Sequence, residues 1–386
     1  MNYPLISEYI EAIKAAKDNF EKLTNLRAVL GDDGQPVMTS GNFAVVFKME
    51  DTETVKFYAL KCFTKEQEGR AEAYHQIAEK LKDVDSPYLV SLRYLEKELF
   101  VDTEQTDETE FPVLLMDWVE GKTLDKYLRE NLDDKYALEM LAYRFSQLAQ
   151  WLIPQPFAHG DLKPDNILVR EDGTLVLVDY DGMYVPAMKG QKARELGSPD
   201  FRHPLRTEND FDEHIDDFPL LSILISLKAT SHNPKLLDEF GESDRLLYSQ
   251  ENYYNIKNCT ISRILPKYLD WKGKQLKKLL EKTCLADYSF NIQGSIISIE
   301  KWKKRYGIFL LLPILLIIAI LLVTFISSPQ ATIWWIIYLL VAFIGLRIAI
   351  FLWNFDSDCG GCGCYICIFF IIIAAIIATK LLHLIY

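Results

Sequence analysis

The sequence predicts an α+β fold with a small strand-rich part, a larger and mostly helical part, and three membrane-spanning helices at the end. Residues 58–63 alternate as a strand does, and residues 111–116 are typical of a buried strand. Residues 124–290 have a mostly helical pattern. Beyond residue 306, apolar residues form runs long enough to cross a bilayer.

The first element expected is a short amphipathic helix within residues 1–24. Its apolar residues recur at helical spacing: Ile6, Ile10, Ile13 and Phe20. Further on, Gly41 lies in a bend that leads into a β-branched strand, and such a bend can present backbone N–H groups to phosphates. A Glu-rich helix is expected over residues 66–82.

Composition limits the functions that are open to the chain. Over 386 residues the formal net charge is -12, which argues against a nucleic-acid-binding protein, because such proteins are normally basic. The first 23 residues are charged throughout and contain no apolar core, so they do not predict a secretory signal. We therefore expect the first domain to remain in the cytoplasm.

Three apolar runs predict helices that span the cell membrane, over residues 307–326, 331–353 and 365–386. A basic segment, residues 301–306, directly precedes the first run. Lys and Arg collect on the cytoplasmic side of membrane helices, so this segment predicts a multi-pass protein whose N-terminal domain faces the cytoplasm.

Four cysteines are clustered near the start of the third run: Cys359, Cys362 and Cys364 lie between the second and third runs, and Cys367 lies just beyond them. Thiolates this close together could bind zinc or an iron–sulfur cluster, or carry a fatty acyl chain. A turn without such a role is the alternative. Their spacing matches no established ligand pattern, so we assign them no metal.

The most informative motif is the run from His159 to Asn166. It places Asp161, Lys163 and Asn166 within one short stretch, and Asp179 follows 18 residues after Asp161. Phosphoryl transfer from ATP needs a base that orients the acceptor hydroxyl, a cation beside the phosphate, and oxygen ligands for Mg2+. These four side chains supply such groups.

A predicted hairpin brings the two oxygen ligands together. Its strands are residues 167–169 and 175–178, and it turns at Asp172-Gly173. Because Asn166 precedes the first strand and Asp179 follows the second, both side chains are expected at the same edge.

Lys61 lies on the same face of its strand as Ala59, where a lysine needs a partner. The Glu-rich helix offers one. We expect an ion pair between Lys61 and Glu72, with Glu68 as the alternative one turn earlier.

The order of these motifs resembles the protein kinase superfamily, specifically its bacterial serine/threonine-kinase-like branch. The resemblance covers about residues 25–290 and includes Gly197-Ser198-Pro199. It implies a bilobal kinase domain over residues 25–300, with an N-lobe over about 25–117 and a C-lobe over about 121–295.

The resemblance also implies roles for individual residues. Asp161 would be the catalytic base, and Lys163 and Lys61 would contact the phosphates of ATP. Asn166 and Asp179 would bind Mg2+. Asp217 would be the buried carboxylate behind the catalytic loop. The ATP site would be formed by Gly41, Phe43, Val46, Ala59, Lys61, Glu72, Met116, Asp117, Val119 and Leu168.

Several positions depart from the family pattern. Gly160 stands where many protein kinases have Arg, and Asp179-Tyr180-Asp181-Gly182 stands where they have Asp-Phe-Gly. Only one glycine of the glycine-rich loop is kept, and the Ala-Pro-Glu segment is absent. Asp181 could add a metal contact or bend the loop.

The predicted function is a membrane-anchored serine/threonine protein kinase that uses ATP and magnesium. Its partners would be a protein substrate near the membrane, the lipid bilayer and, as a further candidate, a second copy of the chain. One alternative is a nucleotide-binding pseudokinase or scaffold, which the divergent loop favours. Another is a kinase of small molecules such as aminoglycosides or choline-like alcohols, because His-Gly-Asp also occurs in those enzymes.

Overall fold

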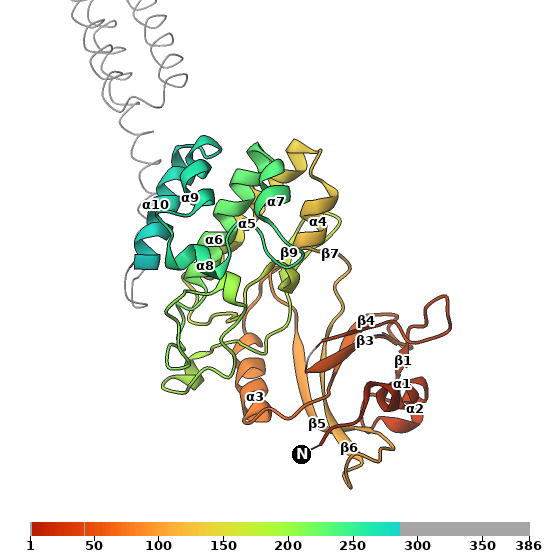
Figure 1. Ribbon diagram of the computed structural model, residues 1–386. Helices are drawn as coiled ribbons and strands as arrows, with labels where there is room; N and C mark the ends of the chain where they lie inside the picture. Colours follow the sequence, from red (N-terminus) through yellow and green to blue (C-terminus); the bar gives the residue numbers. More distant parts are fainter. Residues whose placement is uncertain (1, 42, 286–386) are drawn as a thin grey trace, which may run out of the picture. The chain divides into compact units, whose positions relative to one another are not determined.

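The computed structural model describes residues 2–41 and 43–285. Within these residues a strand-rich lobe is followed by a helical lobe, as the sequence predicts (Figure 1). No helix in this described part of the chain is long and apolar enough to cross a membrane. The three predicted spans and the cysteine cluster lie outside the described residues.

The strand-rich lobe is built on a six-stranded antiparallel sheet. Five strands follow the order β1-β3-β4-β6-β5, and β2 pairs with the free part of β3. The strands are β1 (Leu26–Ala28), β2 (Met38–Ser40), β3 (Ala44–Asp51), β4 (Phe57–Phe63), β5 (Leu92–Phe100) and β6 (Glu110–Asp117). The predicted strands at 58–63 and 111–116 are thereby confirmed as β4 and β6.

One face of this sheet is covered by the N-terminal segment. The predicted helix is present as α1 (Ile6–Lys14), followed by the single turn α2 (Ala16–Asn19). Tyr9 and Ile13 are fully buried in a core that includes Leu60 and Cys62 of β4. The Tyr9 hydroxyl donates a hydrogen bond of 2.7 Å to the Phe63 carbonyl, which fixes α1 to the sheet.

The other face carries α3 (Arg70–Leu81), which packs on β5 (Figure 1). This helix begins four residues later than expected, directly after Gly69. Because side chains alternate along a strand, Lys61 of β4 points to the α3 side while Leu60 and Cys62 point to α1. The sequence therefore places a lysine on an inward face that has polar partners.

The helical lobe contains seven α-helices in the described part of the chain: α4 (Leu124–Glu130), α5 (Lys135–Leu152), α6 (Asp217–His232), α7 (Lys235–Phe240), α8 (Gln250–Tyr254), α9 (Thr260–Ile264) and α10 (Trp271–Leu285). Helix α6 is apolar on all sides and almost completely buried, because α5 and α10 pack against it. It forms the centre of this lobe.

The predicted hairpin is also confirmed. Strands β8 (Ile167–Val169) and β9 (Leu175–Leu177) pair in register, and β7 (Lys122–Thr123) joins the outer edge of β8. Asp172 caps the turn by accepting a hydrogen bond from the Thr174 N–H. This small sheet carries the candidate active site.

Candidate active site

The β8–β9 hairpin brings two loops to the same edge of the small sheet: the first precedes β8, and the second follows β9. The Val178 N–H donates a hydrogen bond of 3.0 Å to the Asn166 carbonyl, so Asn166 lies opposite Val178 and next to Asp179. This arrangement agrees with the expectation that the hairpin brings Asn166 and Asp179 to the same edge.

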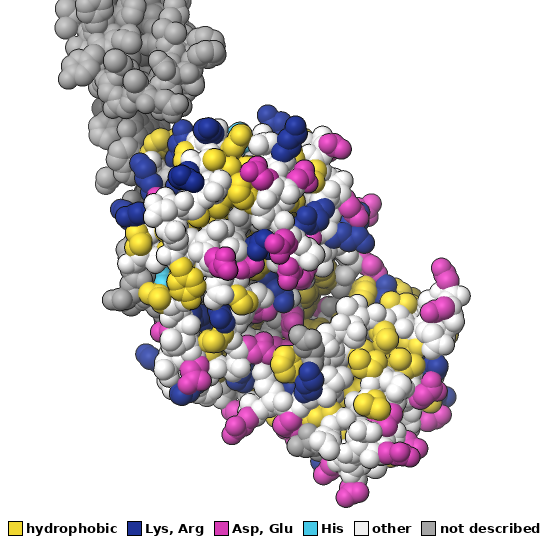
Figure 2. Space-filling view, viewed as in Figure 1, with side chains coloured by type: hydrophobic (Ala, Val, Ile, Leu, Met, Phe, Trp, Pro, Cys, Tyr) yellow, Lys and Arg dark blue, Asp and Glu magenta, His cyan; other side chains and the backbone are white. Residues whose placement is uncertain are grey.

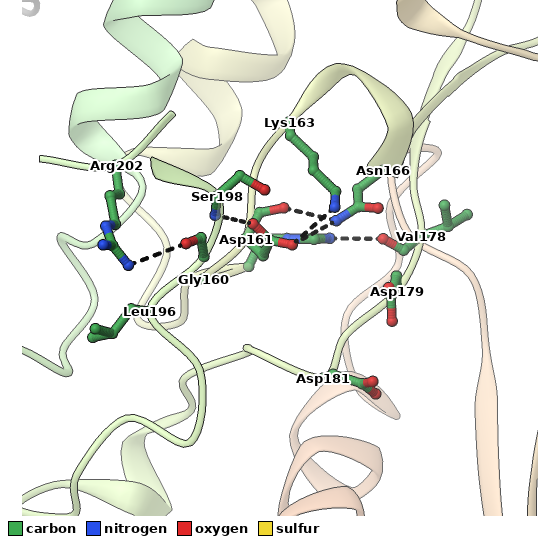
Figure 3. Close-up of polar contacts among 12 residues, drawn as sticks. Gly160, Asp161, Lys163, Asn166, Val178, Asp179, Asp181, Leu196, Ser198 and Arg202 are labelled. Carbon is green, nitrogen blue, oxygen red and sulfur yellow. Dashed lines mark hydrogen bonds and ion pairs between the residues drawn. The ribbon is translucent and has the colours of Figure 1, made fainter. Parts of the chain in front are cut away.

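Asp161 lies at the centre of the first loop (Figure 3). The Asn166 side-chain amide donates to the Asp161 carbonyl at 2.9 Å and to its carboxylate at 3.2 Å. The Lys163 ammonium lies 3.6 Å from the same carboxylate oxygen. The other oxygen accepts a hydrogen bond of 2.8 Å from the Ser198 N–H. Three groups thus fix the orientation of the Asp161 carboxylate.

A buried carboxylate, Asp216, holds this loop from behind. It accepts hydrogen bonds from the N–H groups of His159 and Gly160, the latter at 2.9 Å. Burial raises the pKa of Asp216. From the sequence we expected Asp217 in this role, and that prediction is wrong by one residue. Asp217 is the first residue of α6 and lies instead beside His214, at 3.5 Å.

Gly160 explains one departure from the family pattern. Its φ is +85°, and a Cβ at this position would lie 1.9 Å from the Gly182 carbonyl oxygen. The backbone after His159 and the backbone after Asp181 are therefore in direct contact. No side chain fits between them.

Lys61 reaches this edge from the strand-rich lobe. Its ammonium lies 2.7 Å from Asp179 and 2.8 Å from Asp181, and its side chain is only 7% exposed. Although burial lowers the pKa of Lys61, the interactions with Tyr74, Asp179 and Asp181 raise it well above its usual value. Burial acts to raise the pKa of Asp179, but the Lys61 charge outweighs it and lowers that pKa. Both groups are charged at neutral pH.

The expected partner of Lys61, Glu72, is not at this site. The Glu72 carboxylate is exposed and accepts a hydrogen bond of 2.6 Å from Gln76 of the same helix. Because α3 begins at Arg70, its buried face consists of Arg70, Ala73, Tyr74, Ile77 and Leu81. Glu72 lies on the opposite face, and Glu68 is exposed before the helix begins.

The residues expected around the adenine share one face of the sheet with Lys61. Val46 pairs with Lys61 across β3 and β4, and Ala59 pairs with Met116 across β4 and β6. Directly paired residues point to the same side of a sheet, so these four side chains line one surface. Figure 2 shows the molecular surface hollowed between the two lobes, with acidic side chains beside the hollow.

The remaining expected nucleotide residues lie around this surface. Val119 is buried just after β6, and Leu168 is half-buried on β8. Gly41 closes the turn between β2 and β3 through a 2.8 Å hydrogen bond to the Ala44 carbonyl, and Phe43 is 43% exposed. The Asp117 carboxylate accepts a hydrogen bond from Ser91.

The oxygen donors at the hairpin edge fit a magnesium ion that is shared with nucleotide phosphates. The Asp179 side chain is 45% exposed despite its contact with Lys61. Asn166 uses its amide nitrogen toward Asp161, so its amide oxygen is left for another partner. No group of three His, Cys, Asp or Glu side chains with metal-binding geometry occurs in the described residues. Mg2+ commonly takes one or two protein ligands and completes its shell with phosphates and water.

Comparison with known proteins identifies the family. The sequence model described as "Protein kinase domain" matches residues 35–288, more than half of the chain. The chain belongs to the protein kinase family. The kinase domain thus includes both loops, Lys61 and the sheet face beside it.

Individual relatives carry serine/threonine kinase names. The chain is 28% identical to "Serine/threonine-protein kinase sgk-1" of Caenorhabditis elegans, over 48% of this chain and 40% of that protein. It is 25% identical to "Serine/threonine-protein kinase AtPK1/AtPK6" of Arabidopsis thaliana, over 43% of this chain and 35% of that protein. It is 26% identical to "Putative serine/threonine-protein kinase PRKY" of Homo sapiens, over 56% of this chain and 75% of that protein. The chain therefore spans well under half the length of the first two relatives.

Two contacts of this kinase domain were not expected from its sequence. Tyr74 of α3 donates a hydrogen bond to the Asp181 carboxylate, and Asp216 supports the catalytic loop. The Tyr74 contact could have been found from the sequence. The spacing of Ala73, Tyr74, Ile77 and Leu81 indicates the buried face of the helix, and Tyr74 lies on it. No local signal distinguishes Asp216 from Asp217.

Proposed function

We propose that this protein is an ATP- and magnesium-dependent kinase that transfers the γ-phosphate to Ser or Thr hydroxyls of proteins. The observation that carries the proposal is the convergence of four side chains at one hairpin edge. Asn166 is bonded to Asp161, and Lys61 is bonded to Asp179. Membership of the protein kinase family and the names of the relatives support Ser and Thr as acceptors.

In this proposal, Asp161 orients the acceptor hydroxyl and takes its proton. A carboxylate is suited to this role when its own orientation is fixed. Asn166 and the Ser198 N–H provide that constraint. The Lys163 ammonium, 3.6 Å from the Asp161 carboxylate, would stabilise the negative charge of the phosphate during its transfer.

The nucleotide would lie against the sheet face that bears Lys61. Val46, Ala59 and Met116 offer an apolar surface to a purine, and Lys61 offers an ammonium to the phosphates. When bound, magnesium would be held by Asn166 and Asp179 and would neutralise phosphate charge.

The test is phosphate transfer by the purified full chain with labelled ATP and magnesium, on a generic protein substrate and on a panel of aminoglycosides. We expect labelling of the protein substrate. Asp161→Asn and Lys61→Ala should each lower the rate at least about a hundredfold, because each removes a group that acts on the reacting atoms. Glu171→Gln, an exposed change in the same hairpin, is the matched control and should keep the wild-type rate.

Each other outcome contradicts the proposal. Full activity of Asp161→Asn would show that Asp161 is not the catalytic base. Labelling of an aminoglycoside alone would favour the small-molecule kinase. Nucleotide binding by a correctly folded chain that transfers no phosphate would favour the pseudokinase.

We further propose that the kinase is anchored in the cell membrane with its catalytic domain in the cytoplasm. The apolar runs 307–326, 331–353 and 365–386 and the basic segment 301–306 support this topology. Its substrates would then be proteins near the membrane, and a second copy of the chain is a candidate partner. The order of the sequence motifs supports a place in the bacterial serine/threonine-kinase-like branch.

A further inference from the structure

Lys61 is a buried cation, and the helix beside it supplies no carboxylate. A buried ammonium is costly unless an anion and hydrogen bonds compensate it. In the described residues, the carboxylates within ion-pair distance of Lys61 belong to Asp179 and Asp181. Both belong to the loop after β9, and neither belongs to α3.

The two carboxylates differ in what else they can do. The Asp179 side chain is 45% exposed, whereas that of Asp181 is 12% exposed. If Asp179 binds a magnesium ion, as the proposed function requires, its negative charge is shared between that ion and Lys61. Asp179 then no longer compensates the charge of Lys61 fully. Both carboxylate oxygens of Asp181 are already engaged, one by Lys61 and the other by Tyr74, so Asp181 can remain the partner of Lys61.

Asp181 is itself held in place from α3. Its second carboxylate oxygen accepts a hydrogen bond from the Tyr74 hydroxyl. The Tyr74 ring is stacked on Tyr94 with 5.6 Å between ring centroids and lies 6.0 Å from Phe63. The ring therefore has little freedom, and burial raises the pKa of Tyr74 well above its usual value, so the hydroxyl keeps its proton.

The backbone of Asp181 is also fixed. The Arg194 guanidinium donates a hydrogen bond of 2.9 Å to the Asp181 carbonyl. On the other side, Gly182 lies against Gly160 of the catalytic loop. Asp181 is thus constrained through its side chain, its carbonyl and the following residue.

We propose that Asp181, oriented by the hydroxyl of Tyr74, is the positioning residue that holds Lys61 for the nucleotide phosphates. This pair takes the place that the sequence suggested for Glu72. The proposal rests on the proposed function, since it assumes that Lys61 contacts a nucleotide. Asp181 touches Lys61 and not the substrate, so its effect should pass through the lysine.

The test is the equilibrium affinity of the full chain for a fluorescent ATP analogue in the presence of magnesium. Asp181→Asn should weaken binding about tenfold, because the buried Lys61 ammonium loses the negative charge of its hydrogen-bond partner. Tyr74→Phe, which removes one oxygen atom, should weaken binding about threefold, since it loosens the partner of Lys61. Asp181→Glu keeps the charge and should restore most of the affinity.

A double-mutant cycle separates positioning from a general structural effect. In a chain that already carries Lys61→Met, Asp181→Asn should cause no further loss of affinity. The same tenfold loss in that background would overturn the proposal, because Asp181 would then act without Lys61. Glu79→Gln, an exposed change on the same helix, is the matched control.

Glu72→Gln provides the competing outcome. It should leave affinity unchanged, and a larger loss from Glu72→Gln than from Asp181→Asn would also overturn the proposal. Nucleotide binding is measured without phosphate transfer, so the experiment distinguishes failure of the Asp181 proposal from failure of the proposed kinase function. A chain that transfers phosphate but whose affinity does not depend on Asp181 contradicts only this inference.

Discussion

The backbones of the two loops that carry Asp161 and Asp179 touch at a pair of glycines. A Cβ on Gly160 would lie 1.9 Å from the Gly182 carbonyl oxygen, far inside van der Waals contact. Gly160 also has a positive φ, as does Gly190 farther along the chain, where nothing lies within 4 Å of the added Cβ. A residue with a Cβ would therefore strain the backbone at both positions, but it would find space only at Gly190.

We predict that Gly160→Ala destabilises the protein more than Gly190→Ala does. The positive φ alone should cost about 1–2 kcal/mol at either position. Gly160→Ala should cost roughly 1–3 kcal/mol more, because the two loops must move apart. Thermal unfolding of the full chain measures both, and each kcal/mol should lower Tm by about 2–4 °C. Equal shifts in Tm would show that the glycine–glycine contact is not tight.

The N-terminal helix α1 stabilises the strand-rich lobe by covering one face of its sheet. Ile13 is fully buried against this face, whereas Glu11 of the same helix is exposed and pairs with Lys14. The packing of the helix, and not its own helical propensity, should therefore account for most of its stability.

Ile13→Ala should lower the free energy of unfolding by about 2–5 kcal/mol, because it leaves a cavity between helix and sheet. Glu11→Ala should change it by no more than about 0.5 kcal/mol. Thermal unfolding of both variants gives the comparison. If Ile13→Ala unfolds at the wild-type temperature, α1 does not pack on the sheet in solution.

Sequence patterns predicted those elements whose signal is local. Strands β4, β6, β8 and β9 and helix α1 each follow from a few neighbouring residues that alternate or repeat. The hairpin also predicted that Asn166 and Asp179 would meet, because its register follows from a two-stranded pattern and a turn.

The choice between neighbouring residues of a helix could not be predicted. Asp216, and not Asp217, holds the catalytic loop. On α3 it is Tyr74, two residues after Glu72, that reaches the site, where it donates to Asp181, a carboxylate partner of Lys61. Near the start of a helix, a shift of one or two residues turns a side chain by 100–200°. The exact starts at Arg70 and Asp217 depend on packing with distant segments, which periodicity does not reveal.

For the whole molecule, the proposed anchoring predicts where the kinase is found in cells. The full chain should sediment with membranes and resist extraction by high salt or alkaline carbonate, because apolar spans are released only by detergent. A chain ended after residue 300 is the matched comparison and should lose this resistance. Protease added outside intact cells should not cut the kinase domain. Extraction of the full chain by salt alone would contradict the anchoring.

The match to the kinase family starts at residue 35, yet the layer over one side of the sheet lies before that residue. The six strands alone would leave Leu60, Cys62, Val113 and their neighbours facing water, and a contiguous apolar patch of this kind promotes aggregation. Any relative that shares these strands but lacks a segment like residues 1–24 must shield them by other means, such as a different extension or a second protein. Boundaries drawn from family similarity alone would therefore cut away part of what keeps this lobe soluble.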